Sequence, residues 1–239
     1  MKNNELALVI GGSGDLGTAI IERLLDRGIQ NIISTYRTSI PDIVYPKYVT
    51  WVQYDTDTDP LGERVVKVLG ERPVNYMVFA AGQPSSKKNI SETSHNEWSN
   101  LLEVNAISFS NLYREIHKLV RIGDGRVLVI SSDTTKKLGP GNGPYSASKA
   151  ALEAIAITLS KEELPFGVRV NIFAPTLFDS KLAEKILKLK GVTDIESYKQ
   201  SLPWGHSIPL NEVADSAVSL LCDDSWRYAT SQIFRLGAE

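Results

Sequence analysis

Short hydrophobic runs alternate with longer amphipathic segments along this chain. The runs are rich in β-branched residues, which predicts strands at residues 6–10, 31–35, 48–53, 74–79, 126–130 and 168–173. The segments between them have helical periodicity, which predicts helices at residues 16–27, 60–69, 97–121, 145–164, 180–190 and 211–221. Several runs are apolar on both alternating faces, as strands covered by helices on each side must be. The pattern therefore predicts an α/β fold with a Rossmann-type, doubly wound parallel sheet and helices on both faces.

The alternation continues without a linker, repeat or low-complexity tract, so we expect residues 1–239 to form a single domain. Residues 176–209 are polar and rich in lysine, and we expect them to form an insertion that covers the substrate. The hydrophobic runs are shorter than the ~20 residues of a membrane helix, and no apolar signal segment precedes the first predicted strand. These features favour a cytoplasmic protein without a membrane span.

Net charge, cysteine content and histidine spacing exclude some classes of partner and ligand. The net charge of -2 gives no reason to expect a nucleic acid as partner. Cys222 is the only cysteine, which excludes an internal disulfide. His95, His117 and His206 lie at no metal-ligand spacing with acidic residues or cysteine, so we expect no metal site.

The first predicted strand leads into a helix through a glycine-rich turn, which reads Gly11, Gly12, Ser13, Gly14, Asp15, Leu16 and Gly17. A dinucleotide fingerprint requires this context, because glycines let the backbone approach a pyrophosphate and the helix N-terminus offers unpaired N–H groups. A plain strand-to-helix turn is the alternative. The Asp15 carboxylate would repel a pyrophosphate, so we expect it to point away and to cap helix N–H groups.

The end of the second predicted strand bears on the choice of cofactor. After Thr35 it reads Tyr36, Arg37 and Thr38, with no carboxylate to bind a ribose 2′-hydroxyl. The Arg37 guanidinium matches the geometry of a 2′-phosphate, and Thr38 can add a hydroxyl. This favours NADP(H) over NAD(H), with a solvated turn arginine as the alternative.

Four polar residues at particular intervals indicate an active site. Tyr145 and Lys149 lie one helical turn apart on one face of a predicted helix. Ser132 follows the fifth predicted strand, at the carboxyl edge where open α/β sheets bind ligands. Asn105 lies further upstream. Each alone has an ordinary structural explanation, such as an exposed helix pair, a strand end or a helix cap.

At these intervals the chain resembles the short-chain dehydrogenase/reductase family, specifically the compact single-domain branch that includes the 3-oxoacyl thioester reductases. The resemblance covers nearly the whole chain. It implies an oxidoreductase that transfers a hydride between NADP(H) and a carbonyl or alcohol substrate, with the family's catalytic tetrad at Asn105, Ser132, Tyr145 and Lys149. It also implies cofactor contacts at Gly11, Ser13, Gly14, Asp15, Leu16, Gly17, Tyr36, Arg37, Thr38, Asp55, Thr56, Ala80, Ala81, Gly82, Asn105, Tyr145, Lys149, Pro175, Phe178 and Ser180.

Three positions depart from the family pattern. Ile10 stands where a threonine is usual, and Ala80 stands where the family has an asparagine. Thr176 replaces the glycine that usually follows Pro175, close to the expected nicotinamide pocket.

The chemistry explains why these residue types are needed. A free phenol has a pKa of ~10 and is a poor acid–base catalyst at neutral pH. We expect the Lys149 ammonium and the positive nicotinamide ring to lower the pKa of Tyr145, which then acts as general acid/base. The resemblance implies that Lys149 also holds the nicotinamide ribose, that Ser132 hydrogen-bonds the substrate oxygen, and that Asn105 orients a proton-relaying water.

Two other functions stay open beside the ketoreductase. An epimerase or dehydratase that retains its nicotinamide would share the tyrosine and lysine pair, although the chain is short for that branch of the family. A non-enzymatic NADP(H) sensor would be expected to have lost Tyr145 or Lys149, and both are present.

The family pairs the helices that correspond to residues 97–121 and 145–164 across a two-fold axis, which implies a homo-oligomer, expected as a tetramer. The second helix offers small and apolar residues that allow close approach of another helix, and burial in the core of the monomer is the alternative. These residues are Ala150, Ala151, Ala154, Ile155, Ala156 and Leu159.

Two lysine pairs follow predicted strands at the carboxyl edge of the sheet, namely Lys87 with Lys88 and Lys136 with Lys137. Four ammonium groups around one mouth would attract an anionic substrate, and solvated loop charges are the alternative. Gly123 and Phe166 stand where the acyl-carrier reductases place docking arginines. A free small anion is therefore favoured over a protein-bound acyl chain.

Overall fold

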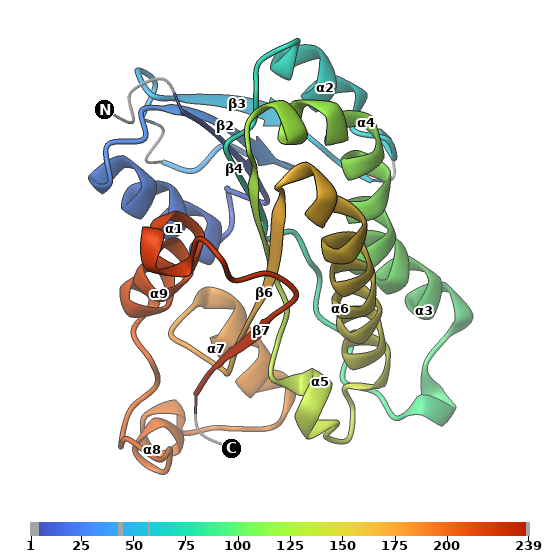
Figure 1. Ribbon diagram of the computed structural model, residues 1–239. Coiled ribbons are helices and arrows are strands. Elements are labelled where there is room, and N and C mark those ends of the chain that lie inside the picture. Colours follow the sequence, from blue (N-terminus) through green and yellow to red (C-terminus); the bar gives the residue numbers. More distant parts are fainter. Residues whose placement is uncertain (1–4, 43–44, 57, 238–239) are drawn as a thin grey trace.

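The computed structural model describes residues 5–42, 45–56 and 58–237, and its described strands form one parallel sheet (Figure 1). The strands are β1 (Leu6–Ile10), β2 (Asn31–Tyr36), β3 (Val49–Gln53), β4 (Tyr76–Phe79), β5 (Arg126–Ile130), β6 (Arg169–Pro175) and β7 (Ile233–Leu236). Their order is β3-β2-β1-β4-β5-β6-β7. Strands β2 and β3 are added on one side of β1 and strands β4 to β7 on the other, so the direction in which strands are added reverses between β1 and β4. Open sheets bind ligands at such a switch point, outside the carboxyl ends of the strands.

Helices cover both faces of the sheet, as predicted. The helices are α1 (Asp15–Asp26), α2 (Glu63–Leu69), α3 (His95–Leu102), α4 (Ser108–Ile122), α5 (Thr134–Lys137), α6 (Gly143–Glu163), α7 (Lys181–Leu189), α8 (Ile195–Gln200) and α9 (Leu210–Cys222). Helices α1 and α9 pack on one face, and α2, α4 and α6 pack on the other (Figure 1). The predicted α/β fold is therefore confirmed.

Strand β1 shows why its sequence is continuously hydrophobic. Leu6, Leu8 and Ile10 are buried in the core layer beneath α2, α4 and α6, whereas Ala7 and Val9 are buried in the layer beneath α1 and α9. Because successive side chains of a strand point to opposite faces, a strand between two helical layers must be apolar at every position.

The structure adds a strand and divides a helix that the sequence pattern predicted differently. Strand β7 pairs with β6 at the sheet edge; its run is only Ile233–Leu236, includes Arg235 and is only partly buried, so its hydrophobic signal is weak. The single helix predicted at residues 97–121 is instead α3, a π-helical turn over Glu103–Ile107 and α4. Apolar periodicity alone does not reveal the extra residue of a π turn, a feature often found at functional sites.

Candidate active site

The turn after β1 is shaped by two glycines. Gly11 has a φ of +84°, and a Cβ built on it would lie 2.6 Å from the backbone nitrogen of Ala81. A Cβ on Gly17 would lie 2.3 Å from the carbonyl oxygen of Gly11. These positions therefore require glycine for the start of α1 to lie against the ends of β1 and β4.

The N-terminus of α1 is suited to an anion. Gly14 is its N-cap, and among the described residues no side chain caps the helix. The N–H groups of the first turn therefore lack the usual capping oxygen, and the helix dipole adds partial positive charge. Gly14, Asp15, Leu16 and Gly17 line the cavity described below, so this turn can hold the pyrophosphate of a dinucleotide.

Asp15 behaves partly as expected. Its carboxylate does not cap α1, on which it lies. It accepts a hydrogen bond of 2.7 Å from the backbone N–H of Lys181, the first residue of α7. The acidic side chain therefore connects the glycine-rich turn to the segment that begins after β6.

A cavity of about 700 Å³ lies at the switch point of the sheet. Ser132 after β5 and both Tyr145 and Lys149 on the first turns of α6 line it. Further lining comes from predicted cofactor contacts Gly11, Gly14, Asp15, Leu16, Gly17, Ala80, Gly82, Pro175, Phe178 and Ser180. The tertiary structure thus gathers three of the four tetrad residues, and twelve of the twenty predicted cofactor contacts, Tyr145 and Lys149 included, line the cavity.

The other predicted contacts do not line this cavity: Ser13, Tyr36, Arg37, Thr38, Asp55, Thr56, Ala81 and Asn105. Most follow the carboxyl ends of β2, β3 and β4, at the same edge of the sheet. The end of β2 is bonded directly to the glycine-rich turn, since Gly11 N–H donates to Thr35 Oγ1 at 2.8 Å and Ser13 N–H donates to the Thr35 carbonyl at 3.2 Å. Arg37, two residues further on, is exposed, and the described residues provide no ion pair for its guanidinium.

Burial dominates the electrostatics of Tyr145. It raises the pKa of the phenol to about 12; a hydrogen bond with Ser132 acts in the opposite direction, and the Asp133 carboxylate raises the pKa further. The sequence analysis predicts a lowered pKa for Tyr145, and the direction found in the protein by itself is the opposite. The cause is that removal of the phenol from water disfavours its charged form, the phenolate.

Burial also lowers the pKa of Lys149 to about 8, against the effect of the Glu153 carboxylate. The Lys149 Nζ donates to the carbonyl oxygen of Ile130 at 2.9 Å. A Cβ on Gly82 would lie 3.1 Å from this Nζ, so the glycine leaves room for the ammonium. Lys149 is therefore fixed at the end of β5 and remains mostly charged at neutral pH.

Asn105 lies in the π-helical turn and is completely buried. Its Oδ1 accepts from the Gln83 N–H at 2.7 Å, and its Nδ2 donates to the Gln83 carbonyl at 3.0 Å and to Ser148 Oγ at 2.9 Å. The Asn105 side chain thus connects the segment after β4 to α6 at Ser148, which lies between Tyr145 and Lys149 in the sequence. The predicted water-relay role stays a prediction.

Glu153 is a buried carboxylate that the sequence pattern did not single out. It accepts from Ser131 Oγ at 2.6 Å and from Thr135 Oγ1 at 2.9 Å, and lies 3.8 Å from the guanidinium of Arg235. These contacts fix the backbone on both sides of Ser132. An acidic residue one turn beyond Lys149 on an otherwise apolar stretch was the available signal.

The predicted ring of four lysines is only partly present. Lys87 and Lys137 line the cavity, whereas Lys88 and Lys136 do not. The charge of Lys137 is paired with Asp133 at 2.7 Å. Lys190, at the end of α7, lines the cavity and was not predicted to do so.

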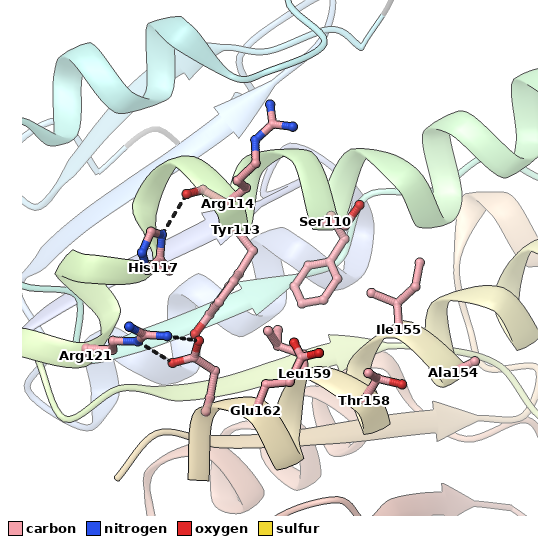
Figure 2. Close-up of a pocket in the computed structure, with 12 residues that line it drawn as sticks. Ser110, Tyr113, Arg114, His117, Arg121, Ala154, Ile155, Thr158, Leu159 and Glu162 are labelled. Carbon is pink, nitrogen blue, oxygen red and sulfur yellow. Dashed lines mark hydrogen bonds and ion pairs between the residues drawn. The ribbon is translucent and has the colours of Figure 1, made fainter. Parts of the chain in front are cut away.

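A second hollow of about 560 Å³ lies between α4 and α6 (Figure 2). It shares no lining residue with the cavity at the switch point, the candidate catalytic cavity. Figure 2 shows Ala154, Ile155, Thr158 and Leu159 of α6 across from Ser110 and Tyr113 of α4. At its end, Arg121 donates two hydrogen bonds of 2.8 Å to Glu163.

Within the described ranges, none of the helices has both the length and the apolar character to cross a membrane. The same residues contain no group of three or more histidine, cysteine or acidic side chains that could hold a metal ion.

The fold and the cavity define a Rossmann-type α/β protein whose polar side chains meet at the switch point of the sheet. A family model described as Enoyl-(Acyl carrier protein) reductase matches residues 21–236. The chain belongs to the short-chain dehydrogenase/reductase family of oxidoreductases, as its motifs predicted.

The relatives span almost the entire chain. The 3-oxoacyl-[acyl-carrier-protein] reductase FabG of Buchnera aphidicola is 24% identical over 225 residues, which cover 91% of this chain and 90% of the relative. An NADP-dependent (R)-specific alcohol dehydrogenase of Lentilactobacillus kefiri is 26% identical over 241 residues, covering 96% of this chain and 94% of that enzyme. A crystal structure of a variant of actinorhodin polyketide ketoreductase with NADPH has a TM-score of 0.86 and 22% identity, over 99% of this chain and 97% of that one. The structural likeness shows the shared fold.

Proposed function

We propose that this protein is an NADP(H)-dependent ketoreductase or alcohol dehydrogenase with Tyr145 as general acid/base. The observation that carries the proposal is that Ser132, Tyr145 and Lys149 line one cavity together with the glycine-rich turn. The bound cofactor would supply or accept the hydride. The first-turn N–H groups of α1 would hold its pyrophosphate, and the segment around Lys149 its nicotinamide end.

The protein's own residues would handle the proton. With a pKa of about 12, Tyr145 is protonated at neutral pH and can donate its proton to the carbonyl oxygen of the substrate. Ser132 hydrogen-bonds to the same phenol, so its hydroxyl can also orient the carbonyl oxygen of the substrate. The Lys149 ammonium would stabilise the phenolate that remains after the transfer, because an adjacent positive charge favours the ionised form.

The preference for NADP(H) rests on Arg37. Its guanidinium is exposed beside the end of β2, which hydrogen-bonds to the glycine-rich turn. A guanidinium can bind a 2′-phosphate through two parallel hydrogen bonds. The alcohol dehydrogenase of L. kefiri is NADP-dependent, and the actinorhodin ketoreductase structure contains NADPH, which supports the same choice here.

We further propose that residues 176–209 cover the substrate. Side chains from this segment form one wall of the cavity, namely Thr176, Leu177, Phe178, Ser180, Leu182, Ala183, Ile186, Lys190, Tyr198, Leu202, Pro203, Trp204, His206, Ser207 and Ile208. The hydrogen bond between Asp15 and the N–H of Lys181 would hold this wall near the cofactor turn.

The surface between α4 and α6 supports the expected homo-oligomer, with a tetramer as the proposed state. Ala154 is exposed, and Ile155 and Leu159 are partly exposed beside the hollow, so their apolar surface is available to a second copy. Ala156, one of the residues predicted for this surface, is buried in the core of the monomer. Light scattering of the purified protein at micromolar concentration tests the proposal, and a monomer would refute it.

The proposed reaction is tested by incubating the purified protein with NADPH and a panel of ketones, aldehydes and oxo esters. We expect NADPH oxidation equal to the alcohol formed. A product that forms without net NADPH consumption would identify an epimerase or dehydratase instead. Binding of NADPH without turnover of any compound would identify a sensor.

A further inference from the structure

Lys87 is held in an unusual position beside the catalytic tyrosine. Its φ of +68° lies in the left-handed region, which lysine rarely adopts. The neighbouring loop fixes it there, since a Cβ on Gly141 would lie 2.7 Å from the Lys87 carbonyl oxygen, and Ser85 Oγ donates to the Gly141 carbonyl at 3.2 Å. Strained backbone of this kind persists where the surroundings determine it and is common at ligand sites.

The Lys87 side chain is half-buried and lines the cavity. Its Nζ lies 5.8 Å from the centre of the Tyr145 ring and donates to Asn142 Oδ1. Both Asn142 and Tyr145 line the cavity. A charged group only a few bonds from the reacting carbon of a substrate could therefore contact this ammonium while the reacting oxygen meets Tyr145.

The positive charge of Lys87 is not neutralised by the described part of the protein. The carboxylates that line the cavity are Asp15 and Asp133, and each has another partner: the Lys181 N–H at 2.7 Å and the Lys137 ammonium at 2.7 Å. Burial and the charge of Lys190 lower the pKa of Lys87. Two like charges that line the same cavity repel each other, and an anion between them would relieve that repulsion.

Apolar side chains from the same segment as Lys190 also line the cavity. Ile186 lies one turn before Lys190 on α7, so the two side chains share a face of the helix, and both line the cavity. Leu182 and Trp204 extend the apolar lining from the same segment. The cavity thus combines the Lys87 ammonium, near the Tyr145 ring, with Lys190 and the apolar side chains of the same segment.

We infer that Lys87 and Lys190 form an anion subsite, so that the substrate of the proposed reductase carries a carboxylate or phosphate group a few bonds from its carbonyl. The inference rests on the proposed function. The Asn142 amide, which accepts from Lys87 through its oxygen, has N–H groups that can donate to the same anion.

The test compares matched charged and neutral substrates. With NADPH, kcat/KM is measured for 3-oxobutanoate against its methyl ester, and for dihydroxyacetone phosphate against dihydroxyacetone. We expect the wild-type protein to prefer the charged member of at least one pair, and the pair that shows the preference distinguishes a carboxylate from a phosphate subsite. Lys87→Gln should lower this charged-to-neutral ratio about tenfold, and Lys190→Gln should lower it less, because Lys190 is exposed and more strongly screened. Lys88→Gln is the control, since that neighbouring lysine does not line the cavity, and its ratio should equal that of the wild type.

The failures are distinguishable. If the wild-type protein oxidises NADPH with the neutral compounds at least as well as with the charged ones, and Lys87→Gln leaves the ratio unchanged, the anion subsite is refuted and the proposed function stands. If no compound supports NADPH oxidation, the proposed function fails and the subsite with it. A rise in the KM for NADPH with an unchanged ratio would assign Lys87 to the cofactor and overturn the inference. If Lys87→Gln fails to fold, the charged-to-neutral ratio of Lys190→Gln and the salt dependence of the wild-type ratio test the inference instead. A lower ratio in Lys190→Gln and a ratio that falls with salt would support the subsite, and no change in either would refute it.

Discussion

The two hollows of this molecule are similar in size and opposite in chemistry. The proposed catalytic cavity measures about 700 Å³ and the hollow between α4 and α6 about 560 Å³. In the first, the Lys87 and Lys190 ammonium groups face the space without an ion pair from the described residues. In the second, Arg121 and Glu163 already satisfy each other through two hydrogen bonds. An ammonium that the described residues leave unpaired at a cavity is available to an anionic ligand, whereas the charges of a closed ion pair already satisfy each other.

The tyrosines of the two hollows, Tyr145 and Tyr113, sharpen the contrast. Burial raises the pKa of Tyr145 to about 12, while Ser132 bonds to its phenol. Burial and the Glu163 carboxylate raise the pKa of Tyr113 further still. Tyr145 shares its cavity with the Ser132 hydroxyl and the Lys149 ammonium, whereas Tyr113 interacts with Glu163 and Arg121. A phenol becomes an acid–base catalyst through such neighbours and not through burial alone.

The largest expected effect therefore comes from Tyr145→Phe, which removes the proposed proton donor. We expect kcat to fall by roughly 10²–10⁴-fold with the affinity for NADPH nearly unchanged, because general acid–base catalysis contributes about that much. The matched change in the other hollow, Tyr113→Phe, should retain activity. Steady-state kinetics and NADPH fluorescence titration measure both. Equal activity of the two variants would remove the distinction between the hollows.

A smaller effect is expected from Arg37→Ala, which removes the proposed 2′-phosphate contact. A hydrogen bond to a charged group contributes about 1.5–3 kcal/mol, so the ratio of kcat/KM with NADPH to that with NADH should fall by roughly ten- to a hundredfold. Arg64→Ala, a change of another surface arginine, serves as the control. Equal efficiency of the wild-type protein with NADH would contradict the assignment.

The pH profile gives a further test of the catalytic cavity. Lys149 has a lowered pKa of about 8, so its ammonium is present at neutral pH and is lost as the pH rises through that value. We expect kcat/KM for carbonyl reduction to fall above about pH 8, by up to about tenfold per pH unit. Glu153→Gln removes a negative charge that raises the pKa of Lys149, so the fall should begin at a lower pH. A profile that moves to higher pH in this variant would contradict the assigned electrostatics.

The smallest effect on activity is expected in the second hollow. Arg121→Ala leaves the Glu163 carboxylate buried without its partner, which should lower the free energy of unfolding by about 1–3 kcal/mol. Catalysis should change little, since neither residue lines the catalytic cavity. Urea denaturation and steady-state kinetics on the same preparation measure the two quantities. A loss of activity with unchanged stability would show that the hollows are coupled.

The sequence by itself determined the features that depend on neighbouring residues. The hydrophobic runs predicted six of the described strands, since a buried parallel strand must be apolar on both faces. The glycines of the first turn and the spacing of Tyr145 and Lys149 are likewise local patterns, and they identified the family and the cavity. Strand β7 was missed because its hydrophobic signal is weak, and the π-helical turn around Asn105 was missed because one extra residue hardly changes the apolar pattern of the helices that flank it.

Only the tertiary structure decided which distant side chains meet. Asp15 bonds to the backbone of Lys181 across 166 positions of the chain, and Glu153 reaches residues on both sides of Ser132 from α6. Sequence alone placed Lys87 and Lys88 together, but the left-handed backbone at Lys87 turns only one of them into the cavity, where Lys190 joins it from α7. The reason is physical: charge and hydrogen bonding act over a few ångströms of space, and a chain specifies those distances only after it has folded.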